Sequence, residues 1–331
     1  MDDATKALTA MLPSHLPEPA IELVDPAVLV PMQQGRTMAS GVFRADGSFC
    51  GSSRTLTSAN RFSGIPDYSV PTKKLSGRFL FAGIGRHHFG HFLLECVPRL
   101  WPLDEDLGLD GLIIIPKQGI DFEAVFKRRL GAFVDLLSDG LPVHFVNEPV
   151  EVDALFVASQ GMGHRLWSAG TERFRNFMRS CVAQRVAPDG PERLYISRRR
   201  IKREEQKVDK EAEIERVMHD AGYEIFHPQE HSLRVQCARY MAASHIVGAD
   251  GSAFHLAPFA MRAGTKVGVF QRRFRSVAMD ALERQITAFC DVELTRVNPL
   301  EPLPDGVSER TEKAKVDLMK LKDAFREADL I

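Results

Sequence analysis

A short segment rich in histidine offers the first residues that could carry out chemistry. His87, His88 and His91 lie within five positions of one another, and Glu95 follows His91 by four. If a helix begins near Phe89, this spacing places His91 and Glu95 on one face, where the carboxylate can orient the imidazole. A histidine held in this way is suited to accept a proton from a hydroxyl group. His91 and Glu95 are therefore the candidate catalytic pair.

Two other interpretations of these histidines stay open. They could be structural residues whose ring nitrogens are satisfied within the core. They could also bind a metal, but the spacing H-H-x-x-H differs from the standard zinc helix, in which the two histidines are four residues apart. We therefore predict no metal site in this chain.

A strongly basic loop follows a strand-like run at residues 193–197. Five of the six residues 198–203 are cationic. Arginine side chains bind phosphate oxygens in a bidentate manner, so this loop could bind a diphosphate. The candidate residues are Arg198, Arg199 and Arg203. The alternative is an exposed basic loop whose charge is balanced by the acidic residues that follow it.

A glycine-containing turn over residues 247–255 is the third candidate. It follows an apolar run and precedes an expected helix, whose first N–H groups could bind a phosphate or a hydroxyl group. The candidate residues are Gly248, Asp250, Gly251 and Ser252. Asp250 or Ser252 could equally serve only as a helix cap.

Short apolar runs alternate with helical patterns, which is typical of an α/β fold with mostly parallel sheets. Residues 1–75 indicate short strands and turns. Strands are then expected at residues 78–83, 111–116, 143–146, 154–158, 193–197, 223–226, 245–248 and 266–270. Helices are expected at residues 89–100, 122–137, 171–186, 210–221, 233–243, from about 252, and over the charged tail 308–331.

Parallel sheets bind ligands at the carboxyl ends of their strands, which is where the basic loop and the glycine turn are expected to lie. A stretch rich in proline and glycine at residues 187–191 predicts a domain boundary. We therefore expect an N-terminal α/β domain over residues 1–187, a Rossmann-like domain over 188–300 and a charged helix within 301–331.

The composition excludes several classes of protein. The 331 residues include 43 Lys and Arg and 44 Asp and Glu, a net charge of −1 that does not indicate binding to nucleic acid. The five cysteines are far apart and form neither a disulfide framework nor a zinc pattern. With no long apolar run and no secretory start, a cytoplasmic protein without a transmembrane segment is expected, and peripheral contact with a membrane stays open.

The candidate segments together resemble the bacterial branch of glycosyltransferase family 61, whose members are often described as capsular polysaccharide biosynthesis proteins. The family segment N-Y-G-H-[FW]-L-L-[ED]-x-L-P-R-L is similar to H-F-G-H-F-L-L-E-C-V-P-R-L at residues 88–100. The family's Y-I-S-R-R is present at 195–199, and its G-[FY]-E-x-x-x-P at 222–228. The block V-G-x-H-G-[AS], followed by P-G-T-x-V, is similar to residues 247–252 and 263–267.

The resemblance implies an inverting glycosyltransferase with two Rossmann-like domains that face each other across a cleft, a GT-B-like architecture. Such an enzyme moves a hexose or pentose from a nucleotide-sugar donor to a glycan or polysaccharide-precursor acceptor, and no metal is required. His91 and Glu95 would act as the base on the acceptor side. The leaving diphosphate would be bound by Arg198, Arg199, Arg203 and the turn from Gly248 to Ser252.

Two positions depart from the family pattern. Asp250 stands where the family usually has histidine, and His255 or Leu256 stands where asparagine is common. An aspartate near a diphosphate would repel it unless the aspartate is protonated, paired with an arginine or turned toward sugar hydroxyls. Two alternatives follow: a non-catalytic relative that binds a sugar nucleotide or glycan, and a sugar-nucleotide-modifying enzyme, such as an epimerase or hydrolase, on the same scaffold.

Overall fold

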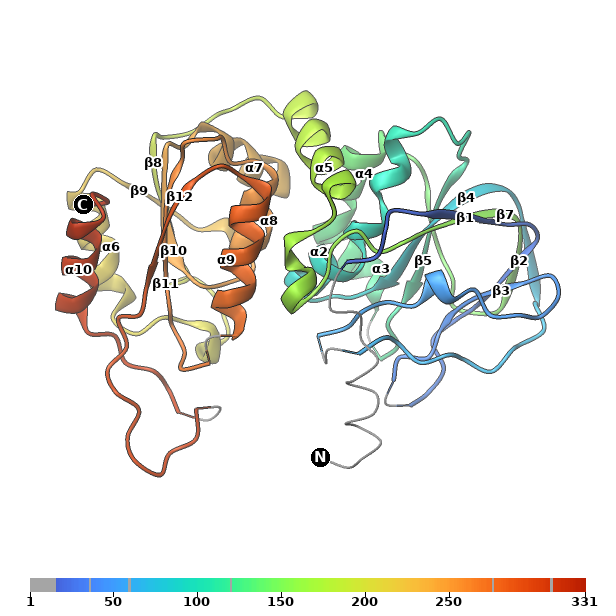
Figure 1. Cartoon of the computed structure of the whole chain (residues 1–331), viewed down its shortest axis with the longest axis horizontal. Coiled ribbons are helices and arrows are strands. Elements are labelled where there is room, and N and C mark those ends of the chain that lie inside the picture. Colours follow the sequence, from blue (N-terminus) through green and yellow to red (C-terminus); the bar gives the residue numbers. More distant parts are fainter. Residues whose placement is uncertain (1–15, 36, 59–60, 120, 276, 310–311) are drawn as a thin grey trace. The chain divides into compact units, whose positions relative to one another are not determined.

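The structure, a computed structural model, describes residues 16–35, 37–58, 61–119, 121–275, 277–309 and 312–331. The chain forms two compact units, of which the first ends at Cys181 and the second begins at Val182. This division lies within helix α5 (Glu172–Arg185), shortly before the stretch where the sequence predicts a boundary. Each unit contains one sheet (Figure 1).

The first unit is built on a mixed sheet that has seven strands within the described residues. The strand order is β3-β2-β7-β4-β5-β6, and β1 also pairs with β7. Strands β7, β4, β5 and β6 pair in parallel, whereas β1, β2 and β3 join by antiparallel pairing. The strands are β1 (Ile21–Val24), β2 (Ala27–Val30), β3 (Gly41–Arg44), β4 (Lys73–Gly85), β5 (Gly111–Pro116), β6 (Val143–Phe145) and β7 (Val150–Ala158).

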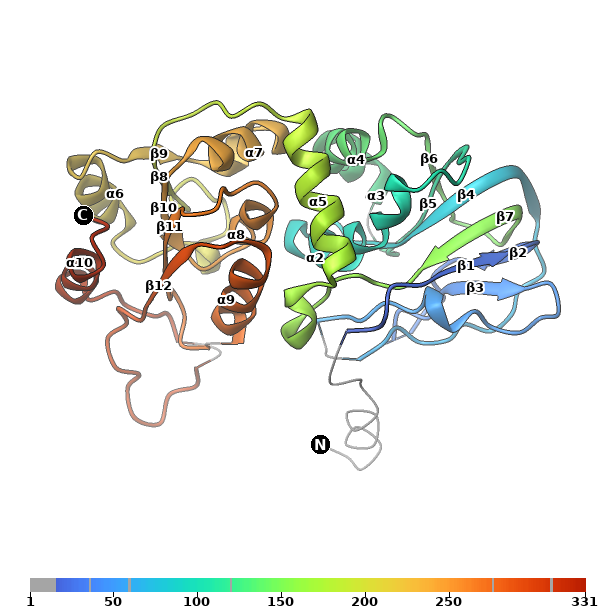
Figure 2. The ribbon, with the colours of Figure 1, turned by 45° about the horizontal axis from the view of Figure 1, so that its top comes forward.

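Parallel pairing explains the apolar sequence of the central strands. All six residues of β5 are buried, as expected of a strand that is covered on both faces. Helices α2 to α5 lie together beside this sheet (Figure 2). The helical segments are α2 (Phe89–Glu95), η2 (Val97–Arg99), η3 (Trp101–Asp104), α3 (Phe122–Val125), the π-helical turn η4 (Phe126–Leu130), α4 (Gly131–Ser138), η5 (Arg165–Ala169) and α5.

Helix α2 is shorter than the sequence suggested. It ends at Glu95, and the expected remainder up to Leu100 is a 3-10 turn that contains Pro98. Proline cannot donate a main-chain hydrogen bond within a helix, which accounts for the early end. The expected helix at 122–137 is present as α3, the π-helical turn and α4.

A buried arginine fixes the segment after α2. Arg99 is fully buried, and its guanidinium donates hydrogen bonds to the carbonyls of Ser52 at 2.8 Å, Ala158 at 2.6 Å and Arg54 at 2.5 Å. Burial lowers the pKa of Arg99 to about 10. This side chain ties the end of β7 and the turn η1 (Gly51–Ser53) to the segment that carries the catalytic candidates.

In the part of the second unit that the structure describes, five strands form a parallel sheet in the order β12-β11-β10-β8-β9. Starting from β8, the chain adds β9 on one side of it. It then adds β10, β11 and β12 in turn on the other side. This is a doubly wound, Rossmann-like order, and its topological switch point lies between β8 and β10. The strands are β8 (Arg193–Ile196), β9 (Glu224–Phe226), β10 (His245–Ala249), β11 (Lys266–Phe270) and β12 (Glu293–Val297).

Helices cover both faces of the second sheet. Helices α6 and α10 lie on one face, and α7, α8 and α9 lie on the other (Figures 1 and 2). The long helices are α6 (Glu211–Asp220), α7 (Leu233–Ala242), α9 (Val277–Phe289) and α10 (Leu318–Glu327). The short ones are η6 (Glu204–Gln206), η7 (Pro228–Glu230), α8 (Ala253–Leu256) and η8 (Ala257–Phe259).

The C-terminal helix belongs to the core of the second unit. Leu321 and Phe325 of α10 pack with Tyr195 and Phe270 of the sheet and with Ile214 of α6. The helix expected over 308–331 is shorter, since α10 begins only at residue 318, and residues 310–311 lie outside the described part. All five cysteines are buried and form no disulfide. In the described ranges, no helix has the length and hydropathy needed to cross a bilayer.

Candidate active site

Helix α2 places His91 and Glu95 on one face, as their spacing predicts. The chain leaves β4 at Gly85 and enters the helix at Phe89, and the buried side chains of Phe92 and Leu93 hold the helix in the core. The Nδ1 atom of His91 lies 2.7 Å from Oε1 of Glu95. The candidate catalytic pair is therefore in hydrogen-bond contact.

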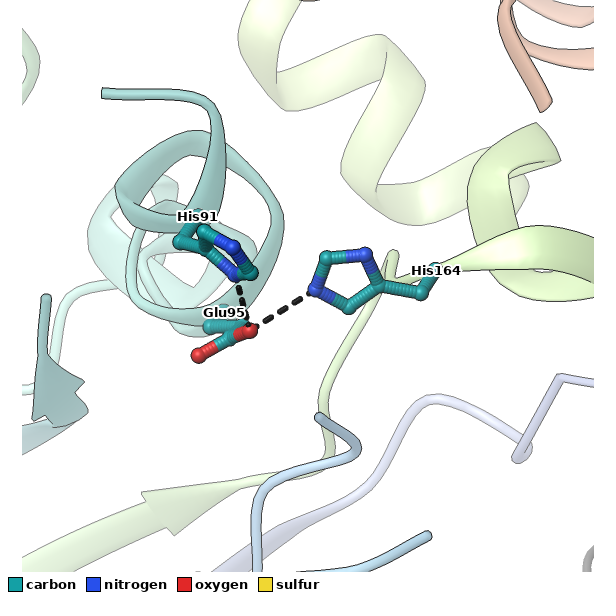
Figure 3. Close-up of side chains that lie close together, drawn as sticks. All are labelled: His91, Glu95 and His164. Atoms are coloured by element: carbon teal, nitrogen blue, oxygen red, sulfur yellow. Dashed lines mark hydrogen bonds and ion pairs between the residues drawn. The ribbon is translucent and has the colours of Figure 1, made fainter. Parts of the chain in front are cut away.

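A second histidine, His164, reaches the same carboxylate from another part of the chain. It lies in the loop after β7, and its Nε2 atom is 2.8 Å from Oε1 of Glu95. Figure 3 shows both imidazoles converging on one oxygen of Glu95, with His91 and Glu95 on the helix and His164 on a separate segment. The centroids of the two rings are 5.2 Å apart.

The loop before His164 is held against the end of α2 by specific contacts. The side-chain amide of Gln160 donates to the carbonyls of Leu94 at 3.0 Å and Met162 at 2.8 Å. The N–H of Gly161 donates to the carbonyl of Pro98 at 2.9 Å. A side chain at Gly161 would clash, because a Cβ there would lie 2.7 Å from Cβ of Phe174. These contacts place His164 beside Glu95.

Glu95 is a fully buried carboxylate surrounded by donors. Its exposed fraction is 0%, and Arg86 Nη1 lies 3.3 Å from Oε2. Burial alone would raise the pKa of Glu95, but the hydrogen bonds from His164 and His91 and the charge of Arg86 outweigh it and lower the pKa to about 2. Glu95 is therefore ionised at neutral pH and is a weak proton acceptor.

The ionised state of Glu95 determines the tautomers of both histidines. A carboxylate only accepts hydrogen bonds, so His91 must carry its proton on Nδ1 and His164 on Nε2. In the neutral imidazole, the lone pair of His91 is then on Nε2 and that of His164 is on Nδ1. The side chains of His91 and His164 are 22% and 13% exposed, so both rings are partly accessible. Glu95 thus orients two imidazoles that can accept a proton.

The second cluster lies at the carboxyl edge of the second sheet. Arg198 follows β8, Asp250 follows β10, and Arg272 and Arg273 follow β11. The carboxyl ends of adjacent parallel strands meet at one edge, and β8 and β10 flank the switch point, where doubly wound sheets bind ligands.

Asp250 forms hydrogen bonds with the two arginines that follow β11. Its carboxylate is buried and accepts from Nε of Arg273 at 2.9 Å and from the main-chain N–H of Arg272 at 3.3 Å, while its carbonyl accepts from Nε of Arg272 at 2.9 Å. Arg198 is close to this group, and burial followed by the charge of Arg272 lowers the pKa of Arg198 to about 10. Glu211 accepts from the main-chain N–H of Arg198 at 2.6 Å. Asp250 thus pairs with the guanidinium groups of Arg272 and Arg273, whereas Nε of Arg198 donates to the carbonyl of Gln206 at 2.9 Å.

The remaining arginines of the basic loop lie outside this group. Arg199 pairs with Glu215 at 2.9 Å, and its side chain is 57% exposed. Arg203 is exposed, and its carbonyl accepts the first hydrogen bond of η6. Of the three arginines predicted from this loop, only Arg198 points into the cluster around Asp250.

The predicted glycines have packing roles. A Cβ at Gly248 would lie 2.9 Å from the carbonyl oxygen of Ile196, so glycine permits the close pairing of β10 and β8. A Cβ at Gly251 would lie 2.2 Å from Nη1 of Arg198, so glycine leaves room for that guanidinium. Ser252 precedes α8 without capping it through its side chain, and the helix itself is only four residues long.

Sequence reasoning missed four residues of these clusters. Arg86 lies within the histidine-rich segment. Arg272 and Arg273 come shortly after a predicted strand, as the residues of the basic loop do. These three could have been found by that rule. His164 has a weaker signal, because 69 positions separate it from Glu95 and only the folded loop brings them together.

The class of protein follows from the two sheets: an α/β protein with two Rossmann-like units. The family follows from sequence comparison, because the model of the family described as Glycosyltransferase 61 matches residues 89–268, more than half of the chain. This chain therefore belongs to glycosyltransferase family 61, and the resemblance found in the motifs is confirmed. The match includes the helix of His91, the loop of Arg198 and the turn of Asp250. No curated protein matches the chain.

Proposed function

We propose that this chain transfers a hexose or pentose from a nucleotide-sugar donor to a hydroxyl group of a glycan or polysaccharide precursor, with inversion at the anomeric carbon. Family membership supports glycosyl transfer. The observation that carries the proposal further is the contact between Glu95 and His91, because it leaves the Nε2 lone pair of His91 as a proton acceptor. His91 is then the base, and Glu95 is the residue that orients it.

The reaction is a single in-line displacement. The acceptor hydroxyl gives its proton to Nε2 of His91 while its oxygen forms a bond to the anomeric carbon. The bond from that carbon to the phosphate oxygen breaks, and the nucleoside diphosphate leaves with the electron pair. Attack from the face opposite the leaving group inverts the anomeric centre.

The leaving diphosphate needs positive charge, and the cluster around Asp250 supplies it in this proposal. Arg198, Arg272 and Arg273 provide charge-assisted hydrogen bonds to phosphate oxygens. Arg199, Arg203 and the turn from Gly248 to Ser252 remain candidates for further donor contacts. Because guanidinium groups can neutralise the leaving group, the proposal requires no metal ion.

The pairing of Asp250 makes this residue compatible with donor binding. The aspartate that replaces the family's usual histidine is paired with Arg272 and Arg273, so its charge is compensated. Its presence near a diphosphate is therefore compatible with donor binding.

The test is a panel of nucleotide sugars incubated with the purified protein, with and without candidate acceptors, while free nucleoside diphosphate is followed. Transfer that depends on acceptor, yields the inverted anomer and is lost in His91→Ala supports the proposal. Donor binding without turnover identifies a non-catalytic relative. A chemically altered sugar in the absence of acceptor identifies an epimerase or hydrolase.

A further inference from the structure

The three residues around Glu95 also form a set of metal ligands. Among the residues that the structure describes, Nδ1 of His91, the carboxylate of Glu95 and Nε2 of His164 all lie within 4.8 Å of one another. Two imidazole nitrogens and one carboxylate oxygen are the three protein ligands of a common type of zinc site, which leaves a fourth position open. The sequence did not indicate this set, because His164 lies far from the helix in the chain.

The distances allow an ion after a small outward movement of the ligands. The two nitrogens lie 2.7 Å and 2.8 Å from Oε1 of Glu95, as hydrogen bonds require. Zinc binds nitrogen and oxygen at ~2.0–2.2 Å in tetrahedral geometry, which spaces ligand atoms by roughly 3.3 Å. Each of these two nitrogen–oxygen distances therefore has to lengthen by roughly 0.5 Å.

Arg86 has two opposing effects on such a site. Its Nη1 atom lies 3.3 Å from the second carboxylate oxygen, Oε2, so it can hold the carboxylate in place as an outer-shell partner. Its positive charge also repels a cation. Arg86→Gln removes the charge but keeps a donor for Oε2, so it should strengthen binding of the ion, whereas removing a ligand should weaken it.

We propose that His91, Glu95 and His164 bind one zinc-like divalent ion, and that the bound ion switches off the base. The inhibitory part rests on the function proposed above. A neutral imidazole has a single lone pair. When Nδ1 of His91 binds the ion, the ring proton moves to Nε2, and that nitrogen then donates a hydrogen bond. His91 can no longer accept a proton from the acceptor hydroxyl.

The binding experiment uses the full chain, freed of metal with a chelator and titrated with Zn²⁺ in a calorimeter and with Co²⁺ in a spectrophotometer. We expect one ion per chain and the intense visible absorption of four-coordinate cobalt. His164→Ala should weaken zinc binding at least tenfold, and His164→Asn provides a second variant of nearly unchanged shape. Arg86→Gln should bind zinc more tightly. His219→Ala is the matched control, because His219 is 77% exposed and lies on α6.

Two results would overturn the site: no saturable binding of one Zn²⁺ by the wild-type protein, or equal weakening by His219→Ala and His164→Ala. This arm needs no sugar substrate, so it is decided independently of the proposed reaction. The inhibition arm measures release of nucleoside diphosphate with Zn²⁺ at ten times its dissociation constant. We expect at least a fivefold loss that EDTA reverses, and unchanged or faster turnover with zinc bound would refute the switch.

Discussion

Replacement of Glu95 by glutamine tests whether this carboxylate orients His91, the proposed base. Glutamine keeps the size of the side chain, and its single oxygen can accept from both histidines in one orientation of the amide, but it has no charge. Its amide N–H₂ group would also face the N–H donors of Arg86 or of a histidine. His91 is then no longer fixed in the tautomer with a lone pair on Nε2. We expect turnover at saturating donor to fall by ~10²–10⁴, the usual range for general-base catalysis.

The same substitution should also lower the free energy of unfolding, by an amount that follows from the pKa of Glu95. The pKa of Glu95 is lowered from 4.5 to about 2, and at ~1.36 kcal/mol per pKa unit the ionised form contributes roughly 3 kcal/mol to folding. Because the folded pKa is the lower one, this contribution is fully present above pH 4.5. It is lost as the pH falls from 4.5 toward 2. The stability difference between wild type and Glu95→Gln should therefore shrink in that range.

The assay pairs urea unfolding with turnover, both at a temperature at which the variant is folded. Glu105→Gln is a matched control, because Glu105 is a partly exposed carboxylate that also pairs with an arginine, Arg173. It should change neither quantity by much. Normal turnover in a folded Glu95→Gln protein would refute the orienting role. A loss of stability without a loss of turnover would show that the group is structural.

Three further predictions concern the rest of the chain. Arg198→Ala and Arg273→Ala should each weaken binding of a nucleoside diphosphate by about 1.5–3 kcal/mol, measured by calorimetry. Arg200→Ala is the control, because Arg200 forms an exposed ion pair with Glu230. It removes the same charge and should leave the affinity unchanged. Gly251→Ala should weaken the same binding, since its Cβ would displace the guanidinium of Arg198; equal affinity would mean that Arg198 is not a donor contact. Arg99→Met should destabilise the protein by about 3–5 kcal/mol in urea unfolding, because three carbonyls lose the guanidinium that donates to them, and a loss below 1 kcal/mol would contradict that role.

The sequence predicts those parts of the fold in which buried positions form a continuous apolar run or a helical repeat. Strands such as β5 and β11 are short apolar runs, and both lie within one residue of the expected positions. Strand β12 and helix α9 were missed. Three of the five residues Glu293–Val297 are polar, because β12 is an edge strand and partly exposed, so the segment lacks the apolar run of a buried parallel strand.

The candidate site was predictable only where it depends on local spacing. The contact between His91 and Glu95 follows from helical geometry alone. The approach of His164 depends on Gln160 and Gly161, which attach a distant loop to α2. The pairing of Asp250 depends on the side-by-side position of β10 and β11, which fixes where Arg272 and Arg273 emerge. Contacts of this kind follow from the tertiary structure, which no single segment of the sequence specifies.

Asp250 has a consequence for how a donor would be selected. Because the carboxylate of Asp250 holds Arg273 and its carbonyl holds Arg272, the conformational entropy of these long side chains has largely been lost in folding. An incoming anion then avoids a cost of about 0.5–1.5 kcal/mol for each side chain that it would otherwise have to immobilise. A rigid charge pattern adapts poorly to anions of other lengths. Asp250 would thus act as an internal template that narrows the range of leaving groups the protein accepts.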